Sequence, residues 1–294
     1  MNKNKFNNCA PIAIFCFNRI DHLKTLIESL KANVDSDKSE VYFFIDNWKH
    51  EHDKEKVTKV KDYVKNITYF EKINIIERDF NYGLQKNITT GIKHVFKKHN
   101  KIIVLEDDLL LSQHFLDFMN KNLDFYESNK NVASIHGYCY PGINVEEDFF
   151  FLRGADCWGW GTWKNKWNIY QHSQKKLFTR LLCSPHKLYK FNFGLYGPYI
   201  KMLIDSCLGR NDSWAIKWYA SAFLKNMYTL YPKNSYVFNT GLDNSGKHCN
   251  NTSDYDTKIC DEYVRVGNIK IEENIEARKE FNKFFKNLAY NKFK

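Results

Sequence analysis

Apolar runs of strand length alternate with amphipathic stretches over the first half of the chain. The runs are rich in β-branched and aromatic residues and predict buried strands at 11–18, 40–46, 73–79, 101–107 and 132–138. Apolar residues at helical spacing between them predict helices at 20–32, 53–65, 84–99 and 112–129, the last with Ser112 as its N-cap. This alternation predicts an α/β fold with a mostly parallel, Rossmann-like central sheet and helices on both faces.

The second half loses this alternation. An aromatic and glycine-rich segment begins at Phe149, and helices are predicted near 199–208, 213–227 and 275–288. The stretch at 228–239 resembles a hairpin, and a Gly/Ser/Asn-rich loop follows it. We therefore expect one domain over 1–250, with a regular half (1–140) and an aromatic half (141–250), and an extension over 251–294.

Composition narrows the class of protein. Hydrophobic residues make up 43% of the 294 residues, which is enough for a large core and excludes extensive disorder. No run of 18 apolar residues or signal peptide is recognisable, and the eight cysteines contain no CxxC pair, so we expect reduced thiols and a cytoplasmic protein.

The net charge of +10 has two interpretations. It could attract anionic partners such as nucleotide phosphates or a membrane surface, or it could reflect lysines spread over every exposed helix. The scattered lysines favour the second interpretation, while peripheral contact with the inner face of an anionic membrane stays open. Nucleic acid is not expected as a partner, because no single element combines a basic and an aromatic cluster.

The segment KIIVLEDDLLL places three acids inside an apolar run. Glu106, Asp107 and Asp108 come where the strand should end, and carboxylates leave water at a high cost unless a cation or hydrogen-bond donors meet them. Ligands bind at the carboxyl ends of parallel strands, and other polar residues follow the predicted strands at 18–19, 46–47 and 79–83. Oxygen ligands of this kind suit Mg²⁺ or Mn²⁺, so we expect one of these ions as a cofactor.

The ordered motifs FCFNR, FFID, NYGLQKN, VLEDD, WGWGTW and NDSW resemble GT-A-fold nucleotide-sugar glycosyltransferases. The nearest types are bacterial family-2-like transferases and the N-acetylglucosaminyltransferase I type, whose acidic element is written EDD. The resemblance covers roughly 11–248 and implies a nucleotide-sugar half over 1–140 and an acceptor half over 141–250. The tail after Cys249 matches nothing in the family.

The resemblance implies a role for each polar position on the donor side. Asp108 would bind the metal, Asp107 the ribose or sugar, and Glu106 would support the site. Arg19 would lie near the nucleotide, and Asp46 would accept a hydrogen bond from a uracil N–H. The turn into the helix after residue 82 would face the phosphates or the sugar through Asn81, Gly83, Lys86 and Asn87.

On the acceptor side, the resemblance implies sugar contacts from Trp158, Gly159 and Trp160, although core packing is an equal alternative for each tryptophan. Asp212 would be the catalytic base, with plain N-capping of the next helix as its alternative. His248 would reach the diphosphate or the metal.

We therefore interpret the chain as a metal-dependent inverting glycosyltransferase that moves a sugar from a UDP-sugar to a hydroxyl of a glycan or lipid-linked acceptor, in surface polysaccharide biosynthesis. The alternatives are an inactive nucleotide-sugar or carbohydrate-binding module on the same fold, and a metal-dependent nucleotidyltransferase. The second is disfavoured because no glycine-rich phosphate loop follows the first strand.

Overall fold

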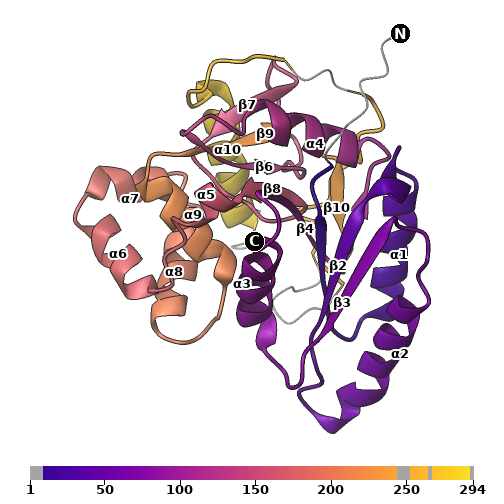
Figure 1. Cartoon of the computed structure of the whole chain (residues 1–294). Coiled ribbons are helices and arrows are strands. Elements are labelled where there is room, and N and C mark those ends of the chain that lie inside the picture. The colour runs from indigo at the N-terminus through magenta and orange to yellow at the C-terminus, as the bar shows by residue number, and fades with distance from the viewer. Residues whose placement is uncertain (1–8, 244–251, 264–266, 292–294) are drawn as a thin grey trace.

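The core of the protein is one large sheet whose first four strands are parallel (Figure 1). The structure is a computed structural model that describes residues 9–243, 252–263 and 267–291. The parallel strands match the predicted runs, which are apolar because both faces of the sheet are covered. They are β1 (Ile12–Cys16), β2 (Glu40–Ile45), β3 (Lys72–Glu77) and β4 (Lys101–Glu106).

The second half of the chain extends this sheet to eight strands in the order β3-β2-β1-β4-β8-β6-β9-β7. β8 and β7 run against their neighbours and the other six strands share one direction, which agrees with the expected mostly parallel sheet. A separate antiparallel pair, β5 with β10, lies beside it. The added strands are β5 (Leu109–Leu111), β6 (Val132–His136), β7 (Phe149–Leu152), β8 (Trp160–Trp163), β9 (Tyr228–Pro232) and β10 (Val237–Asn239).

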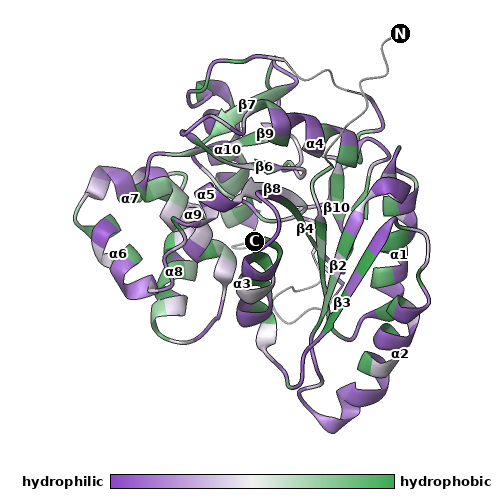
Figure 2. Cartoon of the chain, viewed as in Figure 1, coloured by the Kyte–Doolittle hydropathy of each residue, from purple (hydrophilic) through white to green (hydrophobic). Residues whose placement is uncertain are grey.

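Helices of the first half cover both faces of the sheet. α1 and α2 pack together on one face, and α3 lies on the other (Figure 1). Figure 2 shows hydrophobic positions along β4 and a largely hydrophilic α2, as expected for a covered strand and a surface helix. The helices are α1 (Ile20–Lys31), α2 (Lys54–Lys65), α3 (Gly83–Val95) and α4 (Phe115–Phe125), with short 3₁₀ helices at Ser36–Lys38 and Glu51–Asp53.

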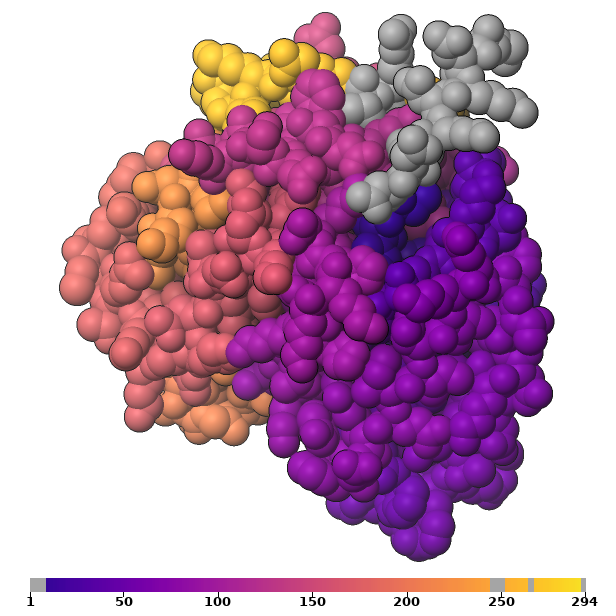
Figure 3. Space-filling model, viewed as in Figure 1, coloured from indigo at the N-terminus to yellow at the C-terminus, as the bar shows by residue number. Residues whose placement is uncertain are grey.

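The helices between residues 164 and 224 gather beside α3 and form a lobe next to the first half, whereas the C-terminal helix packs against β7 (Figures 1 and 3). α9 is buried along almost its whole length and contacts α3, α6 and α8, so it joins this lobe to the sheet. The helices are α5 (Lys164–Trp167), α6 (Gln174–Leu182), α7 (Pro185–Phe191), α8 (Tyr199–Cys207), α9 (Trp214–Leu224) and α10 (Ile275–Asn291).

The tryptophans of β8 connect the two layers of helices. Successive side chains of a strand point to opposite faces of the sheet, so Trp160 and Trp163 pack against different helices. Trp160 stacks on Trp214 of α9, with ring centroids 5.4 Å apart. The indole N–H of Trp163 donates to the carbonyl of Leu123 in α4 at 3.0 Å. Both rings are fully buried, so this Gly- and Trp-rich segment is a core strand.

The C-terminal helix belongs to the same core. Phe281 and Phe285 of α10 are buried, and the Phe281 ring lies edge-on to Tyr231 of β9 at 5.6 Å. It also stacks on Phe193 at the same centroid separation. The extension therefore contributes aromatic side chains to the main hydrophobic core.

Two local predictions were wrong. α4 begins at Phe115 with His114 as its N-cap, and the Ser112 hydroxyl instead donates to the carbonyl of Cys260 at 2.5 Å. The stretch at 228–239 forms no hairpin, because β9 pairs with β6 and β7 whereas β10 pairs with β5. Within the described ranges, no helix has the length and apolar character needed to cross a bilayer.

The packing of α10 predicts a large cost for removing its buried ring. Phe281→Ala should lower the free energy of unfolding by about 3–5 kcal/mol, because a cavity replaces the ring. Tyr290→Ala, at a 52% exposed position of the same helix, is the matched control and should cost less than about 1 kcal/mol. Urea unfolding followed by circular dichroism measures both, and equal costs would contradict the core role of α10.

Candidate active site

The carboxyl ends of β1, β2 and β4 meet at one edge of the sheet. In the strand register, Phe15 lies opposite Glu106, and Cys16 lies opposite Ile45. The chain leaves all three strands at nearly the same level, so Arg19, Asp46 and the acids after β4 are brought to one edge. Parallel pairing thus accounts for the convergence that the sequence predicts.

Arg19 meets two of the three acids. Its Nη2 atom contacts Asp107 Oδ1 and lies 3.0 Å from Asp108 Oδ2. The other oxygen of Asp107 accepts a hydrogen bond from the backbone N–H of Phe17 at 3.3 Å. Asp107 and Asp108 are only 2% and 8% exposed, so a guanidinium compensates two buried carboxylates.

Burial and repulsion between neighbouring carboxylates raise the pKa values of Glu106 and Asp107. The pKa of Glu106 rises to about 8, mainly through burial and then through Asp108, while Arg19 opposes the shift. Burial also raises the pKa of Asp107, although Arg19 limits that rise. Burial disfavours the charge of Arg19, but the two aspartates outweigh this and raise the pKa of Arg19 above its usual value. The edge is therefore short of positive charge.

The loop after β10 closes over Asp108 through Thr240 and Gly241, two residues that the sequence did not single out. The backbone N–H and the hydroxyl of Thr240 donate to the carbonyl of Asp108 at 2.8 and 2.9 Å. A Cβ atom added to Gly241 would lie 2.3 Å from Asp108 Oδ2, so only glycine allows this approach. His22, one turn after Arg19, lies 3.3 Å from the carbonyl of Thr240 and 3.2 Å from a carboxylate oxygen of Asp243.

Asp46 fastens the turn that begins α3. Its Oδ1 atom accepts from the backbone N–H groups of Asn47 at 3.0 Å and Tyr82 at 2.7 Å. Its Oδ2 atom accepts from the Asn81 side chain at 3.2 Å and from the N–H of Gly83 at 2.9 Å. These bonds use the roughly four lone-pair positions of a carboxylate, so a uracil N–H would have to replace one of them. Burial raises the pKa of Asp46, and the backbone N–H donors oppose the shift.

The first turns of α3 divide their polar side chains between the interior and the surface. Asn87 is buried; its side chain accepts from Arg78 Nε at 2.9 Å and donates to the carbonyl of Phe44 at 3.3 Å. Lys86 lies over the ring of Tyr82, with its ammonium 4.0 Å from the centroid. Asn87 therefore ties α3 to β2, whereas Lys86 stays near the helix start.

Asp212 comes close to the same turn from the second half of the chain. A Cβ atom built on Gly83 would lie 3.8 Å from Asp212 Oδ2. The hydroxyl of Ser213 accepts from the N–H of Ile216 and caps α9, so the alternative interpretation of Asp212 as the cap is wrong. In the same helix, the ammonium of Lys217 donates to Gln85 Oε1 at 2.7 Å and links α9 to α3. Burial lowers the pKa of Lys217, while Asp212 acts against this shift.

The three residues expected on the acceptor side differ in exposure. Trp160 is fully buried and offers no ring face to a ligand, so for this residue the core-packing alternative holds. Gly159 has a φ of +64° and its carbonyl accepts from the N–H of Gly137 at 2.7 Å, which fixes the backbone before β8. Trp158 is half-buried, and its ring lies edge-on to Tyr138 at 4.7 Å. His248 lies outside the described residues.

No cluster of three or more His, Cys, Asp or Glu side chains suited to a metal occurs among the residues that the structure describes. Mg²⁺ and Mn²⁺ sites in nucleotide-dependent enzymes use one or two carboxylates and complete the shell with phosphates. The buried carboxylates of Asp107 and Asp108, with Arg19 as their cationic partner, fit this smaller set of ligands.

The sheet order, the acidic edge and a comparison with protein families together define a glycosyltransferase of the GT-A class. The chain belongs to glycosyl transferase family 2, whose model matches residues 12–193, more than half of the 294 residues. The finer resemblance to the N-acetylglucosaminyltransferase I type stays a prediction. No curated protein sequence gives a significant match.

Solved structures with a similar course of the chain include the mannosyltransferase PcManGT from Pyrobaculum calidifontis, in complex with GDP-Man and Mn²⁺. It is 10% identical, with a TM-score of 0.43, over 74% of this chain and 70% of that one. Another is S. aureus TarS, 11% identical with a TM-score of 0.42, over 78% of this chain and 36% of that one.

His136 predicts how stability near the site depends on pH. Its buried Nε2 accepts from the N–H of Trp158 at 3.2 Å, and burial lowers its pKa to about 3. The unfolded chain takes up a proton below about pH 6.5 and the folded chain does not, so stability falls as the pH drops from 6.5 towards 3.

Between pH 7.5 and 5.5, this difference should cost about 1.4 kcal/mol of unfolding free energy. The His136→Gln variant keeps a hydrogen-bond acceptor for the N–H of Trp158. Its unfolding free energy should fall by about 1.4 kcal/mol less than that of the wild type between these two pH values. Urea unfolding at the two pH values compares the proteins. The same loss in both would contradict a neutral His136 in the folded state.

Proposed function

We propose that the protein is a metal-dependent, inverting glycosyltransferase that moves a sugar from a UDP-sugar to a hydroxyl of a glycan or glycolipid. The observation that carries the proposal is the meeting of Arg19, Asp107 and Asp108 at the carboxyl edge of the sheet, with Asp212 near the Gly83 turn. A buried acidic edge with one guanidinium is suited to a nucleoside diphosphate that arrives with a divalent cation.

The donor would lie across the edge between β1, β2 and β4. Asp108, with Asp107 beside it, would hold Mn²⁺ or Mg²⁺; when bound, such an ion offsets the negative charge of a diphosphate leaving group. Arg19 would then be released in part from the aspartates and could approach the nucleotide. The assignment of uracil follows from the resemblance at Arg19 and Asp46.

Transfer needs a base for the acceptor hydroxyl, and Asp212 is our candidate. Its carboxylate approaches the turn at the start of α3. Asp212 belongs to the proposed acceptor half of the chain, whereas the proposed donor residues all belong to the first half. Removal of the hydroxyl proton during a single displacement would invert the anomeric centre. The acceptor half also supplies Trp158, whose partly exposed ring could contact a sugar.

We also propose a role in surface polysaccharide biosynthesis, at the cytoplasmic face of a membrane. This role follows from the family resemblance, and a chain with a net charge of +10 is not repelled by an anionic membrane surface.

Asp108→Asn should abolish metal-dependent nucleotide release, since it removes the charge that holds the cation. We expect a loss of about 100-fold or more in the rate of UDP release. A panel of UDP- and GDP-sugars with Mn²⁺ or EDTA identifies the donor. The control is Asp124→Asn. Asp124 of α4 pairs with Lys101 at the other end of β4, so this variant should keep the wild-type rate of UDP release. Equal release by the Asp108→Asn variant and the wild type would overturn the metal assignment.

Asp212→Asn should keep UDP binding and lose transfer by about 10²–10⁴-fold, because it removes a base without removing a donor contact. Calorimetry with UDP and Mn²⁺ measures binding, and product formation measures transfer. Asp205→Asn, in α8 beside Lys201, is the matched control. Full transfer by the Asp212→Asn variant would assign the base to another residue. NMR of the anomeric proton tests inversion, and a retained configuration would contradict it.

A further inference from the structure

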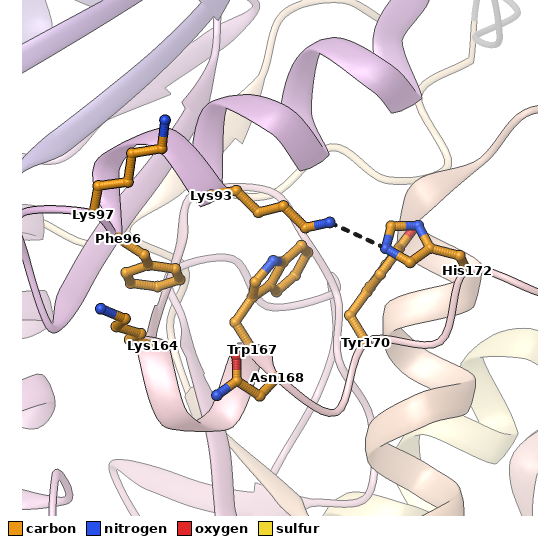
Figure 4. A pocket seen from close by; sticks show the side chains of 8 residues that line it. All are labelled: Lys93, Phe96, Lys97, Lys164, Trp167, Asn168, Tyr170 and His172. Atoms are coloured by element: carbon orange, nitrogen blue, oxygen red, sulfur yellow. Dashed lines mark hydrogen bonds between the residues drawn. The ribbon is translucent and has the colours of Figure 1, made fainter.

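A cavity lies away from the acidic edge, between the end of α3 and the segment that follows β8 (Figure 4). Its volume is about 370 Å³, within the range of about 300–1,000 Å³ typical of small-molecule sites. α3 begins at the proposed donor site with Gly83, and the cavity lies ten or more residues further on, about 15–20 Å along the helix. We call it the basic pocket, and it is lined by Lys93, Phe96, Lys97, Lys164, Trp167, Asn168, Tyr170 and His172.

The charges around the basic pocket are all of one sign. Three lysines contribute ammonium groups and no acidic residue lines the cavity. Within the described part of the chain, Lys93, Lys97 and Lys164 form no ion pair; Lys93 instead lies 3.4 Å from Nε2 of His172 (Figure 4). Three uncompensated cations around one hollow attract an anion.

The helix dipole accounts for only part of this arrangement. Lys93 and Lys97 lie at the C-terminal end of α3, where a positive charge stabilises the helix. Lys164 is the first residue of α5, where the dipole favours an acid. Helix stability therefore gives no reason for a lysine at this third position.

The inner wall of the pocket is aromatic and contains an unsatisfied hydroxyl. Trp167 stacks on Tyr170 with centroids 4.7 Å apart, and both side chains are more than nine-tenths buried. The Tyr170 hydroxyl is buried without a hydrogen-bond partner in the described residues. Figure 4 shows it beside the ring of His172. An unmet buried hydroxyl costs about 1–3 kcal/mol, so this wall of the pocket carries an unpaired polar group.

We propose that the basic pocket binds the phosphate group of a phosphorylated saccharide. Ammonium groups are compact charges that suit phosphate oxygens. Phe96 and Trp167 give the pocket an apolar wall, and the side chain of Asn168 can both donate to and accept from sugar hydroxyls. The site is separate from the catalytic edge, so it does not depend on the function proposed above.

Calorimetry with glucose 6-phosphate tests the proposal. The wild-type chain should bind one equivalent, and the double variant Lys93→Gln/Lys164→Gln should bind at least tenfold more weakly. The control Lys98→Gln/Lys175→Gln removes the same charge from exposed lysines outside the pocket and should change the affinity less than twofold. Circular dichroism verifies that each variant is folded, and UDP binding by the Lys93→Gln/Lys164→Gln variant should equal that of the wild type.

The other probes separate the sources of the anion. Glucose should not bind, and inorganic phosphate should bind more weakly than glucose 6-phosphate; equal affinity for the two phosphates would overturn the sugar part. Vesicles containing phosphatidylglycerol test a membrane headgroup. If they bind through Lys93 and Lys164 while glucose 6-phosphate does not, the proposal is wrong. Absence of saturable binding, equal weakening in the control, or displacement by UDP with Mn²⁺ would also overturn it.

Discussion

The contact between Arg19 and the aspartates after β4 is the interaction on which the acidic edge of the sheet depends. Three acids lie at the end of a strand that is buried on both faces, and burial raises the pKa of Glu106 to about 8. The guanidinium reaches Asp107 and Asp108 because β1 and β4 are parallel neighbours and α1 begins directly after Arg19. Without this cation, two carboxylates would lie uncompensated in the protein interior, which is strongly destabilising.

The remainder of the site comes from segments far away in sequence. β10 pairs with β5 and thereby brings Thr240 and Gly241 onto Asp108. α9 contacts α3 and brings Asp212 towards Gly83. The two halves of the chain are thus joined at the acidic edge by these two contacts. The geometry of the acidic edge therefore depends on correct folding of the aromatic second half of the chain.

Periodicity predicted the first half of the fold well, because strands covered on both faces and amphipathic helices leave clear patterns. It failed where the partner of a segment is chosen by tertiary packing. The strands at 228–232 and 237–239 look like a hairpin but join different sheets. For Trp160 of β8, sugar contact and core packing were equal alternatives from the sequence, and its ring packs in the core. Likewise, Asp46 and Asn87 are polar residues at the expected edge whose hydrogen bonds turn inwards. Neither Thr240 nor His22 carries a strong sequence signal. Thr240 lies in a glycine-containing loop, and His22 follows Arg19 by one helical turn.

A crystal structure with UDP and Mn²⁺, with the metal located by anomalous scattering, tests the central claim most directly. Our account predicts one strong anomalous peak bonded to the Asp108 carboxylate and to the diphosphate, with the nucleotide across the ends of β1 and β2. A nucleotide bound away from this edge, or a metal that does not contact Asp108, would contradict it.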